Sequence, residues 1–190
     1  SPSCLHVCAG TPVRMRCLSE VEFTRYETAN ARTFPPRVFT EVANEHRGKG
    51  HVGGACLRFV RTIFDGGNSD PNAELVLGEV VTMPGRWSSY PPHHHPQPEI
   101  YHYRFTKPQG YGHAELGETV YKVRNYDTVK IFDGLDHPQT AAPGYGMWYA
   151  WVIRHLPERP YTVPEFDPEH TWTQDAQAEF WFPKELQADE

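Results

Sequence analysis

The sequence predicts an all-β protein, a sandwich or barrel built from short strands. Eighteen prolines and fifteen glycines interrupt the chain every few residues. The segments between them are rich in Val, Ile, Tyr, Phe, Trp and Thr, the residue types that favour strands. No window longer than about ten residues carries the 3.6-residue apolar period of an amphipathic helix. Many short strands joined by turns are typical of closed or two-layered β-folds.

Individual strands are expected where β-branched and aromatic residues cluster between turn signals. We predict them at residues 13–17, 21–26, 57–64, 75–83, 99–105, 119–123, 128–132 and 146–153. A short helix is predicted in the tail, over residues 175–186.

One domain boundary is predicted near residues 29–37, a polar segment that contains two adjacent prolines and is typical of a linker. The residues before it are too few to bury a core of their own. The roughly 150 residues after it are a suitable size for one barrel. We therefore divide the chain into residues 1–37 and residues 38–190.

The composition argues against two classes of partner. Eighteen basic and 24 acidic side chains give a net charge of −6, which disfavours binding to nucleic acid. The longest apolar runs, such as residues 147–153, are far shorter than the ~20 residues that a membrane-spanning helix needs. We therefore expect neither a nucleic-acid nor a membrane partner.

The cysteines indicate a reducing environment. Cys4, Cys8, Cys17 and Cys56 form no CxxC pair, which disfavours a zinc knuckle. The sequence also opens without a basic stretch followed by an apolar one, so no signal peptide is visible. We expect reduced thiols in a cytoplasmic protein.

The strongest functional signal is a cluster of potential metal ligands. Side chains alternate along a strand, so His93 and His95 point to the same side while His94 points away. Pro96 and Pro98 favour a turn, after which Glu99 opens the next strand and can return its carboxylate towards both imidazoles.

A fourth ligand has to come from elsewhere in the chain, and His137, three residues after Gly134, is the natural candidate. Three neutral imidazoles and one carboxylate suit a single divalent ion. We expect zinc first, with manganese, iron, nickel and cobalt also suited. A closed structural zinc site would more often recruit cysteine, and none lies near these residues.

Plainer interpretations exist for each of these residues. Three consecutive histidines can belong to a surface loop, and a glutamate at a strand end is usually solvated. The Pro-rich turn between two strong strand patterns favours ligands instead. On the strand that follows, Tyr101 and Tyr103 share a face with Glu99, so they either fill the core or line a pocket, whereas His102 and Arg104 share the opposite face.

The combined motifs resemble a known family. The pattern His-x-His-x3-Glu, followed some 40 residues later by Gly-x-x-His, is similar to the two-part signature of cupins. The segments WSSYPPHHH, EIYHYRF, HPQTAAPGY and DPEHTW resemble the 5-deoxy-glucuronate isomerases of myo-inositol catabolism. The related 4-deoxy-5-hexosulose-uronate ketol-isomerases are less similar. The resemblance is strong over residues 75–172 and weaker near the start.

This resemblance implies a bicupin of which only the tail of the first barrel is present, followed by a metal-binding double-stranded β-helix, a jelly-roll barrel. It also implies an aldose–ketose isomerase acting on a small sugar acid. The sequence departs from the family pattern at Asp136, which we expect to change the pocket charge or to hydrogen-bond a ligand imidazole.

The chemistry of such an isomerase suggests roles for further residues. A base has to move a proton between two carbons; the candidates are Glu99, Tyr101, Tyr103 and a metal-bound hydroxide. The substrate carboxylate needs a cation, for which Arg86 and Lys122 are the candidates. Two alternatives remain open: an iron dioxygenase and a sugar-binding cupin without activity. Strand edges favour pairing between copies, so we expect a homo-oligomer.

Overall fold

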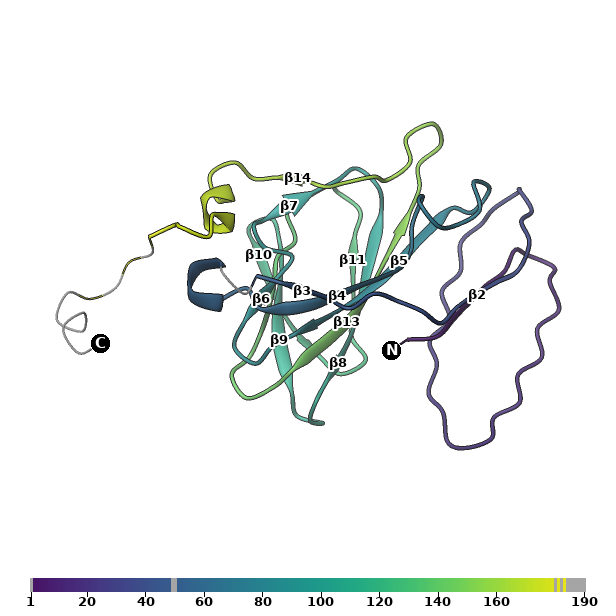
Figure 1. Cartoon of the computed structure of the whole chain (residues 1–190), viewed down its shortest axis with the longest axis horizontal. Helices are drawn as coiled ribbons and strands as arrows, with labels where there is room; N and C mark the ends of the chain where they lie inside the picture. The colour runs from purple at the N-terminus through teal and green to yellow at the C-terminus, as the bar shows by residue number, and fades with distance from the viewer. Residues whose placement is uncertain (1, 49–50, 180, 182, 184–190) are drawn as a thin grey trace.

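The computed structural model describes residues 2–48, 51–179, 181 and 183, and its two main sheets, both antiparallel, form the body of the molecule (Figure 1). The larger sheet has the order β11 (Thr128–Ile131), β8 (Glu99–Phe105), β13 (Met147–Arg154), β5 (Leu75–Thr82), β4 (Arg58–Phe64) and β3 (Glu45–Arg47). The smaller sheet has the order β10 (Thr119–Arg124), β9 (Tyr111–Leu116), β12 (Gln139–Ala141) and β6 (Trp87–Ser88). Together they form the jelly-roll barrel that the sequence predicts.

The barrel core lies between these sheets because alternate side chains of each strand point inward. On β8 and β13 the inward residues are aromatic or large, including Tyr101, Tyr103 and Tyr149, each at most 3% exposed. The smaller sheet contributes small or branched residues such as Ala114 and Val123. Large residues therefore meet small ones across the core, which allows the two sheets to approach closely.

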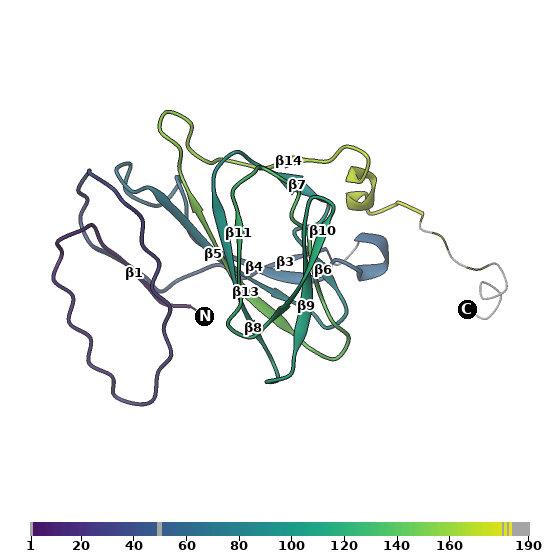
Figure 2. The same ribbon diagram turned by 180° about the vertical axis from the view of Figure 1, so that it is seen from behind.

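The N-terminal segment covers the outer face of the larger sheet. Strand β1 (Cys4–His6) pairs with β2 (Arg37–Phe39), and the His6 ring stacks on Phe64 with centroids 4.3 Å apart. Figure 2 shows the long loop between β1 and β2 extending away from the barrel. A second apolar cluster forms beneath this cover, from Phe39, Ile63, Phe64, Leu77 and Val152. Strand β5 is consequently buried on both faces, which explains its nearly continuous apolar sequence.

Six of the eight predicted strands are confirmed to within a residue or two: 57–64, 75–83, 99–105, 119–123, 128–132 and 146–153. The predictions for residues 13–17 and 21–26 are wrong. Those residues lie in the projecting loop without ladder hydrogen bonds, and apolar side chains such as Leu18 and Phe23 are exposed. Strand β9 was not predicted because Gly112, His113 and Glu115 break its apolar pattern.

The segment predicted as a linker packs against the barrel. Asn30 Nδ2 donates to the Asn72 carbonyl (2.7 Å), and Asn72 Nδ2 donates to the Thr33 carbonyl (3.0 Å). Phe34 is buried. Strands β1 and β2 pair across the predicted boundary, and the division into residues 1–37 and 38–190 stays a prediction.

Helical structure in the described residues is confined to two short 3₁₀ turns, η1 (His51–Gly54) and η2 (Thr171–Gln174). The helix predicted over residues 175–186 is absent from its described part, since residues 175–179, 181 and 183 form a turn and coil, and the rest of the prediction lies outside the described residues. Two further strands are considered below, β7 (His93–His94) and β14 (Glu165–Phe166). No helix in the described part of the chain has the length and apolar character needed to span a membrane.

A tight contact between β5 and β13 gives a stability prediction. A Cβ atom at Gly78 would lie 2.1 Å from Cζ2 of Trp151, so Gly78→Ala should displace the indole and lower the free energy of unfolding by about 1–3 kcal/mol. Gly66→Ala is the matched control, because a Cβ there meets nothing within 4 Å, and it should change stability by less than about 0.5 kcal/mol. Urea unfolding measures both; equal effects would contradict this account of the packing.

Candidate metal centre

Three of the four predicted ligands converge at one end of the barrel. His95 Nε2 lies 3.1 Å from Glu99 Oε2, and His137 Nε2 lies 3.3 Å from the same oxygen. All three side chains are nearly inaccessible to solvent, with exposed fractions of 4%, 3% and 1%. Buried ionisable groups this close together are typical of a functional or metal-binding site.

Local structure explains why these residues meet. Glu99 is the first residue of β8, where it pairs with Ile131 of β11 and Ile153 of β13. Glu99 is buried and shares a face of β8 with Tyr101 and Tyr103, as the alternation predicted, and this face points into the barrel. His137 follows the turn at Gly134, whose positive φ of 62° suits glycine. A Cβ at Gly134 would lie 3.5 Å from the His95 carbonyl oxygen, so this turn packs directly against the His95 backbone.

Each of the predicted imidazole ligands is oriented by a backbone carbonyl two residues away. The Nδ1–carbonyl distances are 3.0 Å for His93 with Pro91, 3.0 Å for His95 with Gln97 and 2.8 Å for His137 with Leu135. A carbonyl oxygen only accepts, so in the neutral ring the proton resides on Nδ1 and Nε2 presents a lone pair. This arrangement prepares Nε2 to bind a metal ion.

The polar atoms of the cluster also fit an ion. His137 Nε2 is buried and has no hydrogen-bond partner in the described part of the structure. With the proton on Nδ1, the lone pair of His95 Nε2 faces the carboxylate oxygen of Glu99. A positive ion between these acceptors would satisfy all of them. His95, Glu99 and His137 are therefore the residues that would hold it.

Burial keeps the imidazoles in the form that can bind a metal. Burial, together with the positive charge that a protonated His137 would carry, lowers the pKa of His93 to about 3. Burial also lowers the pKa of His137, against the opposing effect of the Glu99 carboxylate. Both rings are consequently neutral at neutral pH, as ligation requires.

His93 lies beside this group, with its ring centroid 5.0 Å from that of His137. The ligand atoms of His95, Glu99 and His137 all lie within 4.8 Å of one another, and His93 is not part of this group. His94 points away, as predicted: its Nδ1 lies 2.9 Å from Asp136 Oδ1 and its Nε2 lies 3.6 Å from Glu165 Oε2. Asp136 thus bonds the outward histidine and not an imidazole of the cluster.

The site includes aromatic residues that the sequence analysis missed. The chain after β13 crosses the end of the barrel, where β14 pairs with β7 (Figure 1). In this segment the Tyr161 ring contacts His95 edge-on at 4.9 Å between centroids, and Phe166 contacts His93 at 5.3 Å. These residues enclose the imidazoles from outside the barrel.

The predicted tyrosines lie at different depths. The Tyr101 ring lies 5.7 Å from that of His137, and its hydroxyl is 3.2 Å from Ser89 Oγ. Tyr103 is fully buried and its hydroxyl donates to Gln139 Oε1 at 2.5 Å. Burial raises the pKa of both tyrosines well above 10. Tyr101 is therefore the one next to the imidazoles.

The two cations predicted for substrate binding are both exposed. The Lys122 ammonium lies 4.0 Å from the centre of the Tyr111 ring. Arg86 is anchored by its backbone carbonyl, which accepts bonds from Ala141 N (3.0 Å) and Thr140 Oγ1 (3.2 Å). Their proposed role in substrate binding stays a prediction.

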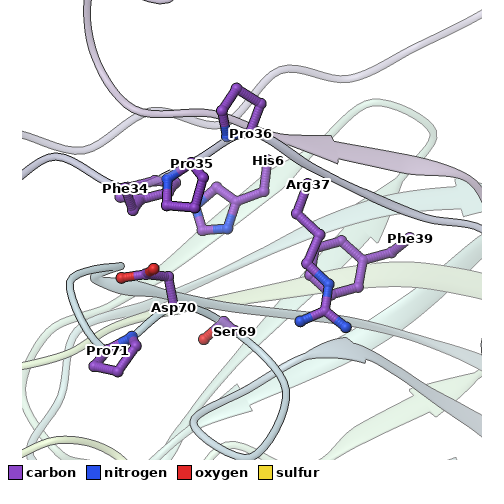
Figure 3. Close-up of a pocket in the computed structure, with 9 residues that line it drawn as sticks. All are labelled: His6, Phe34, Pro35, Pro36, Arg37, Phe39, Ser69, Asp70 and Pro71. Carbon is purple, nitrogen blue, oxygen red and sulfur yellow. The ribbon is translucent and has the colours of Figure 1, made fainter.

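A separate cavity lies where the N-terminal segment meets the barrel. Figure 3 shows its walls, with His6, Phe34 and Arg37 on one side and Asp70 and neighbouring residues on the other. Its volume is about 340 Å³. It shares no residue with the metal-binding candidates, so it is a different feature of the molecule.

The fold and this site together define a cupin, a jelly-roll barrel with imidazole and carboxylate groups inside one end. A cupin 2 conserved barrel domain protein from Rhodopseudomonas palustris superposes with a TM-score of 0.52 and 19% identity, covering 77% of this chain and 88% of that one. The chain belongs to the KduI/IolB family, whose model matches residues 1–173.

Individual relatives agree with this assignment. The 5-deoxy-glucuronate isomerase of Geobacillus kaustophilus (strain HTA426) is 30% identical over 92% of this chain and 66% of its own length. That of Geobacillus thermodenitrificans (strain NG80-2) is 29% identical, with 92% and 67% covered. An IolB-like protein from Salmonella typhimurium LT2 superposes with a TM-score of 0.67 and 28% identity, covering 76% of this chain and 58% of that one. The chain spans about two thirds or less of the length of these relatives.

The geometry predicts which side chains are needed for metal binding. His95→Ala, Glu99→Gln and His137→Ala should each reduce the bound divalent metal to well below one ion per chain, because each removes a donor from a small buried set. His94→Ala is the matched control and should keep its metal, since that ring faces Asp136. Elemental analysis of the purified variants measures this. Full metal content in His137→Ala would contradict the assignment.

Proposed function

We propose that this chain is a metal-dependent isomerase that interconverts the aldose and ketose forms of a deoxy-uronic acid. The observation that carries the proposal is the buried group of His95, Glu99 and His137, in which the His137 Nε2 makes no hydrogen bond to any described residue. The KduI/IolB family assignment supports the same conclusion.

The names of the relatives favour one substrate. Curated relatives are named 5-deoxy-glucuronate isomerase, and they match 92% of this chain. We therefore propose that 5-deoxy-glucuronate is converted to 5-dehydro-2-deoxy-gluconate, in inositol catabolism. We propose zinc as the ion, held by His95, Glu99 and His137, with His93 adjacent as the fourth predicted ligand. The homo-oligomeric state expected from the sequence stays a prediction.

The groups of the site would have different roles in the reaction. A divalent ion there would act as a Lewis acid, stabilising negative charge that develops on the substrate oxygens as the proton leaves carbon. The backbone carbonyls fix the imidazole orientations, so little reorganisation is needed during the reaction. Tyr161 and Phe166 exclude water from the imidazoles, which strengthens electrostatic interactions there.

Tyr101 is the better supported of the two tyrosines for hydrogen bonding to the substrate. Its ring contacts His137, and its hydroxyl interacts with Ser89, a side chain that can rotate. The Tyr103 hydroxyl is committed to Gln139, whose Nε2 donates in turn to the His137 carbonyl at 2.8 Å. We therefore assign Tyr103 a supporting role and keep Glu99 and Tyr101 as candidates for proton transfer.

The proposed reaction is tested by metal removal and reconstitution. Chelated protein should lose isomerisation of 5-deoxy-glucuronate, and added zinc should restore it, because the ligand group is buried and specific. The ketose product is measured by spectroscopy or chromatography. Metal-dependent oxygen uptake would indicate the dioxygenase alternative. Sugar binding by the metal-loaded protein without turnover would indicate the non-enzymatic one.

The two tyrosines give a second prediction. Tyr101→Phe should lower kcat by about 10²-fold while metal content and folding stay unchanged, because a proton-transfer or hydrogen-bonding group next to the reacting atoms is lost. Tyr103→Phe should instead lower stability by about 1–3 kcal/mol, since Gln139 Oε1 loses its buried donor, and should leave kcat within a few-fold. Steady-state kinetics and thermal unfolding, measured on both variants, distinguish the two effects. A larger kcat loss in Tyr103→Phe would reverse the assignment.

A further inference from the structure

Arg58 is a cation that points into the barrel. It begins β4, two residues before Val60, which belongs to the barrel core, so alternation places Arg58 on the same inward face. The side chain is held in place by main-chain oxygens: Nη1 donates to the Cys56 carbonyl at 2.9 Å, and Nη2 approaches the Tyr90 carbonyl at 3.4 Å. Nothing in the sequence pattern around Arg58 marks it as a site residue.

The charge of Arg58 lacks an acidic partner. Other arginines on the larger sheet pair with carboxylates, including Arg61 with Glu79 and Arg154 with Glu74. Among the described residues, no carboxylate lies within 4.0 Å of Arg58, and its contacts are with neutral carbonyls. A guanidinium has five N–H donors, so three remain after these two bonds. A half-buried cation with free donors is suited to bind an anion.

This cation lies near the imidazole cluster. Tyr90, whose carbonyl contacts Arg58, is three residues before His93. Ser89, which precedes Tyr90, has its Oγ 3.2 Å from the Tyr101 hydroxyl, and the Tyr101 ring lies 5.7 Å from the ring of His137. The Tyr149 hydroxyl lies 3.2 Å from the same Ser89 oxygen, so Arg58 adjoins the segment that carries these contacts.

We propose that Arg58 binds the carboxylate of the sugar acid and thereby determines which end of the substrate meets the imidazole cluster. In an aldose–ketose isomerisation of a uronic acid, the reacting carbonyl and the carboxylate lie at opposite ends of the carbon chain. The anchoring cation must therefore be near the metal-binding residues without touching them. This assignment rests on the proposed function for the identity of the substrate, and it replaces exposed Arg86 and Lys122 with an inward-facing residue.

Binding measurements test the assignment without requiring turnover. Isothermal titration of the zinc-loaded protein compares D-glucuronate with the neutral D-glucuronamide. The wild type should bind glucuronate about 10- to 100-fold more tightly, because charge-assisted hydrogen bonds to a carboxylate are lost with the amide. Arg58→Gln should remove this preference by weakening glucuronate alone, with glucuronamide affinity and zinc content unchanged.

Matched variants complete the experiment. Arg47→Gln makes the same charge change at the β3 position paired with Arg58, on an exposed side chain, and should keep the preference. If Arg58→Gln fails to fold, Arg58→Lys is the substitute, because it keeps the positive charge but loses the planar guanidinium that can bind both carboxylate oxygens. It should reduce the preference for glucuronate several-fold.

The assignment is overturned if the wild type shows no preference, if the folded Arg58 variant keeps it in full, or if Arg86→Gln or Lys122→Gln removes it. Failure of the proposed isomerisation would be seen separately, as absence of ketose product from the wild type.

Discussion

The bond from each ring Nδ1 to a backbone carbonyl is the interaction on which the site depends. Three imidazoles, at His93, His95 and His137, each make this bond to a carbonyl two residues away. The bond selects the tautomer and aims Nε2 at the interior. An unsatisfied buried polar atom costs about 1–3 kcal/mol, so leaving Nε2 of His137 without a donor is unfavourable unless another group fills the space. A positive ion bound at His137 Nε2 would remove this cost.

The barrel makes this arrangement possible by keeping water out and strands in register. Glu99 starts a strand that has β11 on one side and β13 on the other, so its backbone is held in register, and its side chain is buried. Below it, Tyr101 and Tyr103 fill the core and limit the depth of the site. Above it, the β14 segment brings Tyr161 and Phe166 against the rings. The cluster is therefore enclosed by residues from widely separated parts of the chain.

The sequence was sufficient to predict the parts of the site that depend on local geometry. Strand alternation and the Pro-rich turn predicted that His95 and Glu99 would meet, and the glycine turn marked His137; the structure brings these three together, while His93, predicted on the same grounds as His95, lies beside the group. Contacts made by distant segments were not predictable. Tyr161 contacts His95 only because β14 pairs with β7, and Arg58 approaches the Tyr90 carbonyl only because the barrel closes. Residues 13–26 have a strand-like composition, but composition does not supply a neighbouring strand to bond.

The central claim is that one ion sits among His95, Glu99 and His137. Anomalous diffraction from crystals of the zinc-loaded protein tests it most directly. The account predicts a single strong peak about 2.0–2.2 Å from Nε2 of both histidines and from a Glu99 oxygen. A peak at another group of residues, or none in this cluster from protein that retains its zinc, would contradict it.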